Sequence, residues 1–243
     1  MASYTIANSN NPVRWKKTSG LSLADLQADG IPDIEDNISE LIPVAAYSFT
    51  ALGTALEFDT DEASQIYGGK LDDTHAIITW DSGAAGGGIK AQAFEVDTDA
   101  ETITAKDSAI VVDSASAAGS NGMLILDSTH FMVFWFQAST SSMRMFEVAA
   151  DYSITALDSE FVFDASENTS PLSAVLIDAS KFILFYGKPS DGQDGFTRVF
   201  DYDVSSGVIT ALDSELEFDT TEAQSIGAVL VDDNKAVCYW CRS

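Results

Sequence analysis

The sequence has little positive charge. Only 12 Lys and Arg stand against 38 Asp and Glu in 243 residues, which gives a formal net charge of -26. This balance excludes nucleic acid as a direct partner, because phosphate binding needs a basic surface, and it disfavours anionic membranes. Residues 1–20 are the exception, with Arg14, Lys16 and Lys17 and no acid. A small basic arm therefore precedes a strongly acidic body.

Long apolar runs and cysteines are also scarce. No stretch approaches the ~20 apolar residues that a membrane span needs, and the polar first 20 residues predict no secretory signal peptide. The two cysteines, Cys238 and Cys241, lie in a predicted strand, where positions three apart face opposite sides. We therefore expect neither a redox nor a metal role for this pair.

What the sequence does have is an internal repeat. Its clearest element is an aliphatic residue followed by Asp, with an aromatic residue nine positions after the aliphatic one. The four copies are Leu71–Trp80, Leu126–Trp135, Ile177–Tyr186 and Val231–Trp240. A second element ends in Asp and precedes the first by 12 or 13 residues: Leu56–Asp59, Ile110–Asp113, Phe161–Asp164 and Leu216–Asp219. A third is Ile/Phe-Thr-Ala, beginning at Phe49, Ile103, Ile154 and Ile209.

Each repeat predicts four short strands separated by turn residues. The first strand carries small residues, such as Gly68, Gly122 and Gly227, which suit a crowded position near an axis. The second is apolar on both faces and should be enclosed by neighbouring sheets. The third and fourth alternate apolar and polar residues, so we expect them to be half exposed.

Repeats of roughly 50 residues with this pattern predict an all-β, four-bladed β-propeller. The predicted propeller spans residues 39–243, and an open solenoid is the alternative. The last repeat holds only two strands before the chain stops, while residues 49–58 match a fourth strand. Residues 39–45 could supply the missing third strand. We therefore expect the last blade to be closed by both termini, which leaves no open sheet edge.

Residues 1–38 lie outside the repeat and predict a non-repeat N-terminal arm, either a docking segment or a disordered end. Part of this arm resembles the calcium-binding type 3 repeats of thrombospondin, through Asp25, Asp29, Asp33 and Asp36 around a Gly-x-Pro turn. The resemblance implies calcium held by hard oxygen ligands. Gln27 departs from the pattern, and the alternative is a helix stop with solvated acids.

Histidines are as scarce as cysteines. His75 and His130 occupy one repeat position, where the other two copies carry Lys181 and Lys235. Such sharing indicates a polar turn position rather than a general base. The sequence has neither a G-x-S-x-G nor a phosphate-binding loop. We therefore predict no catalytic, cofactor-binding or metal-binding residue and no enzyme activity.

The motif Ile-Thr-Ala-Leu-Asp-Ser followed by Phe-Asp, at Ile154–Asp164 and Ile209–Asp219, resembles repeats in uncharacterised propeller-like proteins of phages. The resemblance covers about residues 45–243. It implies a virion component of the tail, a fibre or the capsid surface, and it transfers no functional residue.

We therefore expect a non-enzymatic structural or binding protein of a virion. Residues 1–38 would anchor it to other virion proteins or to copies of itself, without nucleic acid or membrane insertion. The alternative is a glycan-binding propeller that stacks host-surface sugars on Trp80 and Trp135. A propeller hydrolase is disfavoured by the missing site residues. Outside a virion, the expected location is the cytoplasm, or the exterior without a Sec signal.

Overall fold

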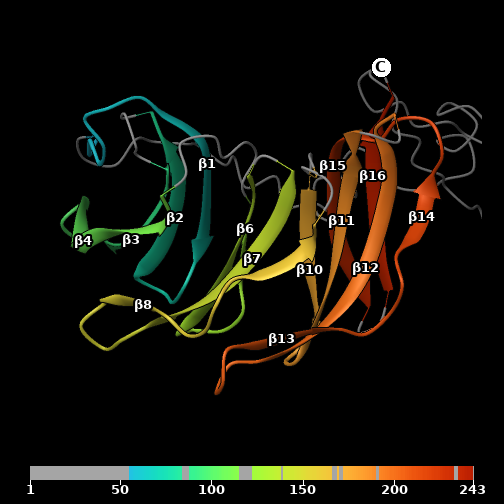
Figure 1. Cartoon of the computed structure of the whole chain (residues 1–243). Helices are drawn as coiled ribbons and strands as arrows, with labels where there is room; N and C mark the ends of the chain where they lie inside the picture. Colours follow the sequence, from blue (N-terminus) through green and yellow to red (C-terminus); the bar gives the residue numbers. More distant parts are fainter. Residues whose placement is uncertain are drawn as a thin grey trace, which may run out of the picture. The chain divides into compact units, whose positions relative to one another are not determined.

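The computed structural model describes residues 55–83, 88–114, 122–137, 139–165, 169, 172–189, 192–232 and 235–242. Its regular elements are β-strands arranged in antiparallel sheets, which confirms the predicted all-β class (Figure 1). The arm at residues 1–38, with its acids at the expected calcium site, and the predicted strand at residues 39–45 lie outside the described residues. Within the described ranges, no helix is long and apolar enough to cross a membrane.

Four sheets follow one another along the chain. The first sheet contains β1 (Ala63–Lys70), β2 (His75–Ser82), β3 (Gly88–Asp97) and β4 (Thr102–Asp113). The second contains β5 (Gly122–Ile125), β6 (His130–Gln137), β7 (Thr140–Val148), β8 (Ile154–Ala156) and β9 (Phe161–Asp164). The third contains β10 (Leu172–Asp178), β11 (Lys181–Lys188), β12 (Asp194–Asp203), β13 (Val208–Ala211) and β14 (Leu216–Asp219). The fourth contains β15 (Gln224–Asp232) and β16 (Lys235–Cys241).

The outer strand of each repeat bends at its Asp-Ser motif. In the second and third sheets the bend divides the strand into two pieces, so β8 and β9 both pair with β7, and β13 and β14 both pair with β12. In the first sheet β4 is continuous, but Asp107 at the same repeat position has a positive φ of 55°. The bend exposes the Asp carbonyl, which accepts a side-chain hydrogen bond from the third strand. The pairs are Gln92 to Asp107 (2.7 Å), Arg144 to Asp158 (2.6 Å) and Arg198 to Asp213 (2.8 Å).

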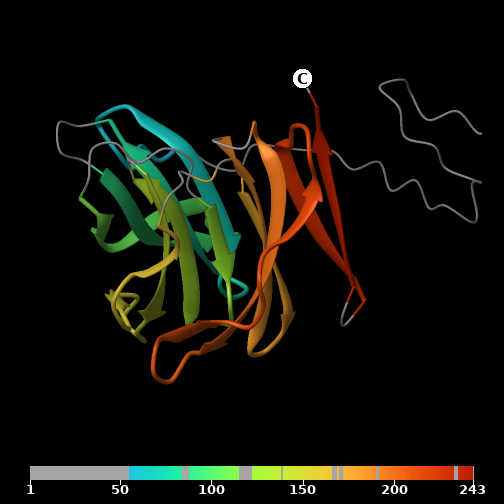
Figure 2. The same ribbon diagram turned by 45° about the vertical axis from the view of Figure 1, so that its right-hand side comes forward.

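Consecutive sheets pack face to face around three apolar clusters, and Figure 2 shows the sheets from a second direction. The first cluster joins β2 and β3 to β6, the second joins β6 and β7 to β11 and β12, and the third joins β11 to β15 and β16. The second strands β6 and β11 are buried along most of their length, as predicted. These contacts are compatible with a propeller-like fold.

The first strands lie close to one another where their residues are small. A Cβ on Gly69 would lie 2.5 Å from Ile125 of β5, and a Cβ on Gly122 would lie 2.5 Å from Leu172 of β10. Gly68, the residue chosen from the sequence, has more room, because its nearest neighbour is a backbone oxygen at 3.8 Å. Small side chains are therefore needed for the close approach of adjacent first strands.

Two expectations about exposure were wrong. The third strands β3 and β7 are mostly buried rather than half exposed, because each pairs with a strand on both of its edges and contributes side chains to the apolar clusters between sheets. The last second strand, β16, is mostly exposed despite its apolar sequence. Among the described residues β16 has only β15 as a strand neighbour, so its burial is not complete.

Candidate functional site

The titratable side chains of the repeat gather first at the hairpin between the first and second strands of each sheet. His75 Nδ1 lies 2.9 Å from the Asp72 carboxylate, and His130 Nδ1 lies 2.9 Å from that of Asp127. The two lysine copies make the matching ion pairs, Lys181 with Asp178 at 3.6 Å and Lys235 with Asp232 at 3.2 Å. In all four copies this side chain lies close to the Asp of its own hairpin, which is compatible with the polar turn position expected from the sequence.

The aspartate of this hairpin is the fixed part of the arrangement. Asp72 Oδ1 accepts hydrogen bonds from the backbone N–H groups of Thr74 and His75, both at 2.8 Å. The Thr74 bond, followed by those from His75, outweighs burial and lowers the pKa of Asp72 to about 2. A carboxylate held ionised in this way closes a tight turn, as an Asp that bonds its own backbone two residues on commonly does.

A second set of charged groups lies where one sheet meets the next. In two copies, the Asp at the end of the repeat's second element, Asp59 or Asp219, contacts the aromatic residue of the following second strand. Asp59 accepts a hydrogen bond from Trp80 Nε1 at 2.6 Å and pairs with Lys90 at 3.1 Å. The Trp80 bond outweighs burial and holds the pKa of Asp59 well below its usual range. We call each such contact an inter-sheet joint.

The joint at the fourth sheet repeats this arrangement. Asp219, at the end of β14, accepts a hydrogen bond from Trp240 Nε1, and Arg242 approaches the same carboxylate at 2.8 Å. Burial raises the pKa of Asp219, but bonds from Thr221, Arg242 and Trp240 outweigh it and lower the pKa to about 2. The residue before each Asp adds a ring contact: Phe58–Trp80 at 4.9 Å and Phe218–Trp240 at 5.0 Å, both edge to face.

The joint between the second and third sheets has tyrosine in place of tryptophan. Lys188 lies 3.0 Å from Asp164 and 2.6 Å from Glu215, while Tyr186 Oη donates a hydrogen bond to Glu215. Burial, reinforced by Glu215, raises the pKa of Tyr186. Burial lowers the pKa of Lys188, but its hydrogen bonds to Glu215 and Asp164 outweigh burial and raise it. Lys188 is therefore the cation that the two carboxylates at this joint share.

The corresponding aromatic residue of the second sheet is Trp135, which is 1% exposed. Its Nε1 makes no hydrogen bond to any described residue. Asp113 holds the place in the sequence that Asp59 and Asp219 hold in their joints. In all four copies an Asp stands 21 or 22 residues before an aromatic residue. This spacing is visible in the repeat, but a contact between the two was not predicted from the sequence.

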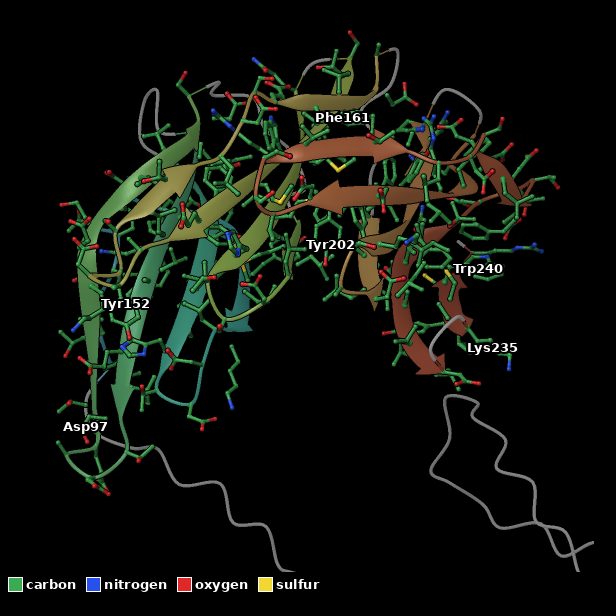
Figure 3. The ribbon with its side chains drawn as sticks, turned by 90° about the horizontal axis from the view of Figure 1, so that it is seen from below. Asp97, Tyr152, Phe161, Tyr202, Lys235 and Trp240 are labelled. Atoms are coloured by element: carbon green, nitrogen blue, oxygen red, sulfur yellow. The ribbon has the colours of Figure 1, made fainter. Side chains whose placement is uncertain are left out.

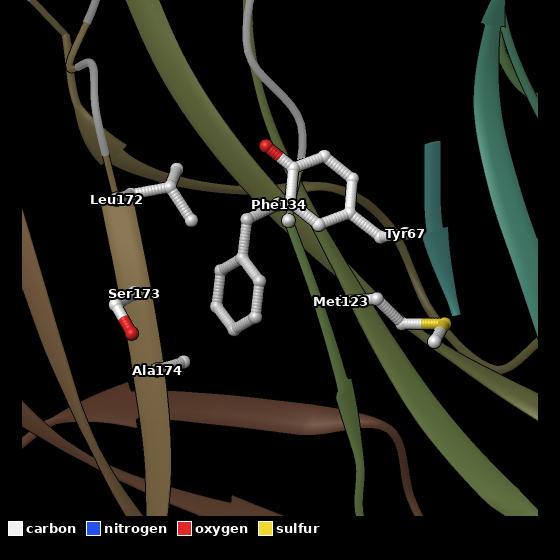
Figure 4. Close-up of a pocket in the computed structure, with 7 residues that line it drawn as sticks. Tyr67, Met123, Phe134, Leu172, Ser173 and Ala174 are labelled. Atoms are coloured by element: carbon white, nitrogen blue, oxygen red, sulfur yellow. The ribbon is translucent and has the colours of Figure 1, made fainter. Parts of the chain in front are cut away.

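A small hollow lies among the first strands (Figure 4). It measures about 120 Å³ and is lined by Tyr67, Gly122, Met123, Phe134, Leu172, Ser173 and Ala174. Ligand sites usually span about 300–1,000 Å³, so this hollow has room for a few waters rather than for a metabolite. Ser173 Oγ accepts the backbone N–H of Ala228 at 3.1 Å, which uses the hydroxyl to connect β10 with β15.

The residues considered for sugar stacking and for redox chemistry have other surroundings. Trp80 is fully buried and Trp135 nearly so, which leaves neither ring face open to a glycan. Cys238 and Cys241 are free thiols on β16, and burial raises the pKa of Cys238 to about 11. Redox cysteines need a lowered pKa. In the part of the chain that is described, no group of His, Cys, Asp or Glu is placed to hold a metal ion.

Comparison with known proteins identifies no family for this chain. No family model and no curated protein matches the chain. One solved structure with some likeness is described as a "putative 6-phosphogluconolactonase" from Bacteroides fragilis. Its identity to this chain is 13% and its TM-score is 0.41, over 59% of this chain and 36% of that one. The chain therefore matches little more than a third of that protein's length.

Proposed function

We propose that the chain is a four-bladed β-propeller that serves as a non-catalytic structural component of a phage virion. Each of the four sheets would be one blade. The observation that carries the structural role is the recurrence of the inter-sheet joint. Asp164 and Asp219 connect the second sheet to the third and the third to the fourth, and Asp59 makes the corresponding contact with the first sheet.

The repeated polar groups are used for rigidity. The hairpin aspartates close turns, and the joint aspartates bind a neighbouring sheet through buried charge-assisted hydrogen bonds, which are about twice as strong as neutral ones. The two histidines each contact the Asp of their own hairpin. A scaffold of this kind presents loops and an acidic surface while its chemistry-bearing residues remain occupied.

The virion setting is supported by the resemblance of the repeat to phage proteins and by the distribution of charge. An acidic body repels copies of itself, so the basic cluster of Arg14, Lys16 and Lys17 could reach an acidic patch on a neighbour and offset that repulsion. Trp15 lies within the cluster, and Trp and Arg are favoured as interface anchors. Residues 1–38 would then carry assembly, while the propeller is displayed outward.

The test is incorporation into phage particles. We expect the full chain to co-sediment with purified particles at a fixed copy number, and deletion of residues 1–38 to abolish incorporation while the β-type circular dichroism spectrum is kept. Trp15→Ala should weaken incorporation, whereas Tyr4→Ala, an aromatic change in the same arm outside the basic cluster, should not. A full chain that is absent from purified particles would sink the proposal.

A further inference from the structure

The fourth sheet exposes an apolar face that its counterparts bury. On β15 and β16 the side chains of Val229, Val237 and Tyr239 are 52%, 50% and 61% exposed. The residue that Tyr239 matches in the repeat is Phe134 of β6, which is fully buried against the third sheet. The opposite face of the fourth sheet packs on the third through Ile226, Ala228 and Cys238. The exposed face is therefore the one that, in the other repeats, packs on a following sheet.

The first sheet exposes apolar side chains at the other end of the row. Ile66 and Tyr67 of β1 are 53% and 36% exposed. Most other large exposed apolar side chains of the described residues lie in or beside the outer strands. Exposure of first and second strands is thus concentrated at the two sheets that have a packed neighbour on one side only.

Among the described residues, one edge of β16 has no strand partner. In the second and third sheets the second strand pairs on one side with the first strand and on the other with the third. Within the described residues β16 pairs with β15 alone. Trp240 and Lys235 mark this strand in Figure 3. An apolar strand with an unpaired edge is a template for another strand.

A segment near the N-terminus carries the sequence of the missing strands. Residues 44–52, Val-Ala-Ala-Tyr-Ser-Phe-Thr-Ala-Leu, match Val148–Leu157 at eight of nine positions when Asp151 is skipped. In the second sheet that stretch contains the end of β7 and all of β8. Residues 49–59 then match Ile209–Asp219, which spans β13 and β14. The segment therefore reads as a third strand followed by a complete outer strand.

The end of this segment already has the position that the match requires. Phe58 and Asp59 contact Trp80 of the first sheet as Phe218 and Asp219, at the end of the third sheet, contact Trp240 of the fourth. Asp164 and Asp219 each belong to the sheet that precedes the aromatic residue of their joint. By the same rule Asp59, which lies in no described strand, would end a sheet that precedes the first one, and among the described residues the fourth sheet is the one without outer strands.

We infer that the fourth sheet is a docking site for this chain's own residues 38–58. Residues 38–44 would pair with the free edge of β16, residues 49–58 would form the outer strand, and the exposed face would pack on the first sheet to close the ring. The same chain is the occupant because the segment is tethered at Ala55–Asp59 beside the first sheet. A tether gives an effective concentration of about the millimolar range, above that of a second copy in a dilute solution. This inference rests on the propeller proposed above, but not on a place in a virion.

The sequence match to β7 also predicts which residues of 38–44 pair with which residues of β16. In the second sheet Val133 of β6 pairs with Arg144 of β7. Val133 corresponds to Cys238, and Arg144 corresponds to Glu40, so Glu40 should lie directly opposite Cys238. Pro43 corresponds to Glu147 near the end of β7, where the missing N–H costs one ladder hydrogen bond.

The register provides a disulfide test on the full chain. Glu40→Cys in a Cys241→Ser background places one new thiol opposite Cys238, within the distance that a disulfide spans. Oxidised glutathione supplies the oxidant: the two thiols lose two electrons to form the bond, and the glutathione disulfide is reduced to two thiols. Ser39→Cys in the same background is the matched control, because adjacent strand positions face opposite sides.

We expect Glu40→Cys to give an intramolecular disulfide, seen as a monomer 2 Da lighter on intact mass analysis, at a yield well above that of Ser39→Cys. A disulfide-linked dimer would overturn the same-chain occupant and show that the segment pairs with a second copy. Equal, low yields from both variants would overturn the pairing. Because a displaced register could also lower the yield, hydrogen exchange of the unmodified chain is the second measurement. The amides of β16 should exchange as slowly as those of β6, and fast exchange along β16 would contradict the inference. Particle incorporation is measured separately, so failure of one proposal is distinguishable from failure of the other.

Discussion

Two inter-sheet joints of the molecule differ in the side chains that contact the joint carboxylate. At the joint of the third and fourth sheets, the Asp219 carboxylate accepts an indole N–H from Trp240, with Arg242 at its exposed side. At the joint of the second and third sheets, Tyr186 takes the place of the indole. Its hydroxyl donates to Glu215 instead, and Lys188 bridges Glu215 and Asp164.

The comparison shows which part of the joint is invariant. The carboxylate at the end of the outer strand stays, and the group that satisfies it changes with the reach of the aromatic residue opposite. An indole N–H reaches the carboxylate directly. Where tyrosine stands instead, a lysine from the same strand contacts the carboxylate and also bridges to a second one, which accepts the tyrosine hydroxyl. The tyrosine joint therefore depends on one buried lysine more than the tryptophan joints depend on their cations.

Among the substitutions at the joints, removal of Lys188 should cause the largest loss of stability. Lys188 is 9% exposed, and Lys188→Met would leave Asp164 and Glu215 without their cation. Breaking a buried ion pair on one side costs roughly 3 kcal/mol or more, and we expect a loss of that size in urea unfolding followed by circular dichroism. Lys188→Arg keeps the charge and should retain most of the stability. A loss below about 1 kcal/mol, typical of a surface pair, would show that the joint does not depend on the lysine.

The contribution of the indole hydrogen bond can be isolated by two equal substitutions. Trp80→Phe removes the donor to Asp59, whereas Trp135→Phe removes an N–H that bonds to no described residue. Both changes leave a similar cavity, so the difference in unfolding free energy reports the hydrogen bond. We expect Trp80→Phe to cost about 1.5 kcal/mol more, the usual value for a bond to a charged group. Equal losses would mean that Trp135 has an acceptor of its own.

Lowering the pH should weaken the joint formed by Asp219. The pKa of Asp219 is about 2, below the value of about 3.9 expected for an unfolded chain. Its contribution is therefore complete above about pH 4 and is lost as the pH falls toward 2. We expect the unfolding temperature of the wild type to fall more steeply across this window than that of Asp219→Asn, measured by scanning calorimetry. Protonation of surface acids relieves repulsion equally in both proteins and cancels in the difference. Parallel curves would contradict a depressed pKa.

The smallest loss of stability should follow removal of the exposed cation of the tryptophan joint. Arg242 contacts Asp219 at 2.8 Å, but its side chain is 61% exposed. Exposed pairs contribute little, so Arg242→Ala should lower the unfolding temperature by no more than about 2 °C. A fall as large as that of Lys188→Met would remove the distinction between the two kinds of joint.

The repeat explains how much of this fold the sequence predicts. The strict spacing of aliphatic, Asp and aromatic residues indicates four similar units, and the apolar runs of β6 and β11 indicate enclosed strands. The shared position of His75 and Lys181 indicates a turn. These properties are local or periodic, so they can be recognised in the amino-acid sequence alone.

The exposure of β16 shows where the pattern fails. Its sequence is as apolar as that of the other second strands, but burial depends on neighbours, and a strand cannot encode whether a sheet lies beside it. The third strands β3 and β7 are more buried than the sequence predicts, again because burial depends on the neighbouring strands and sheets.

The sequence by itself determined the all-β class, the repeat, and the turn role of the hairpin Asp and His or Lys. The tertiary structure alone decided that Asp164 and Asp219 join one sheet to the next, that Asp59 contacts the first sheet in the same way, and that indoles or a lysine satisfy these carboxylates. The aspartate and its partner are more than 20 residues apart in sequence, and a contact at that separation forms only when two sheets have packed against each other.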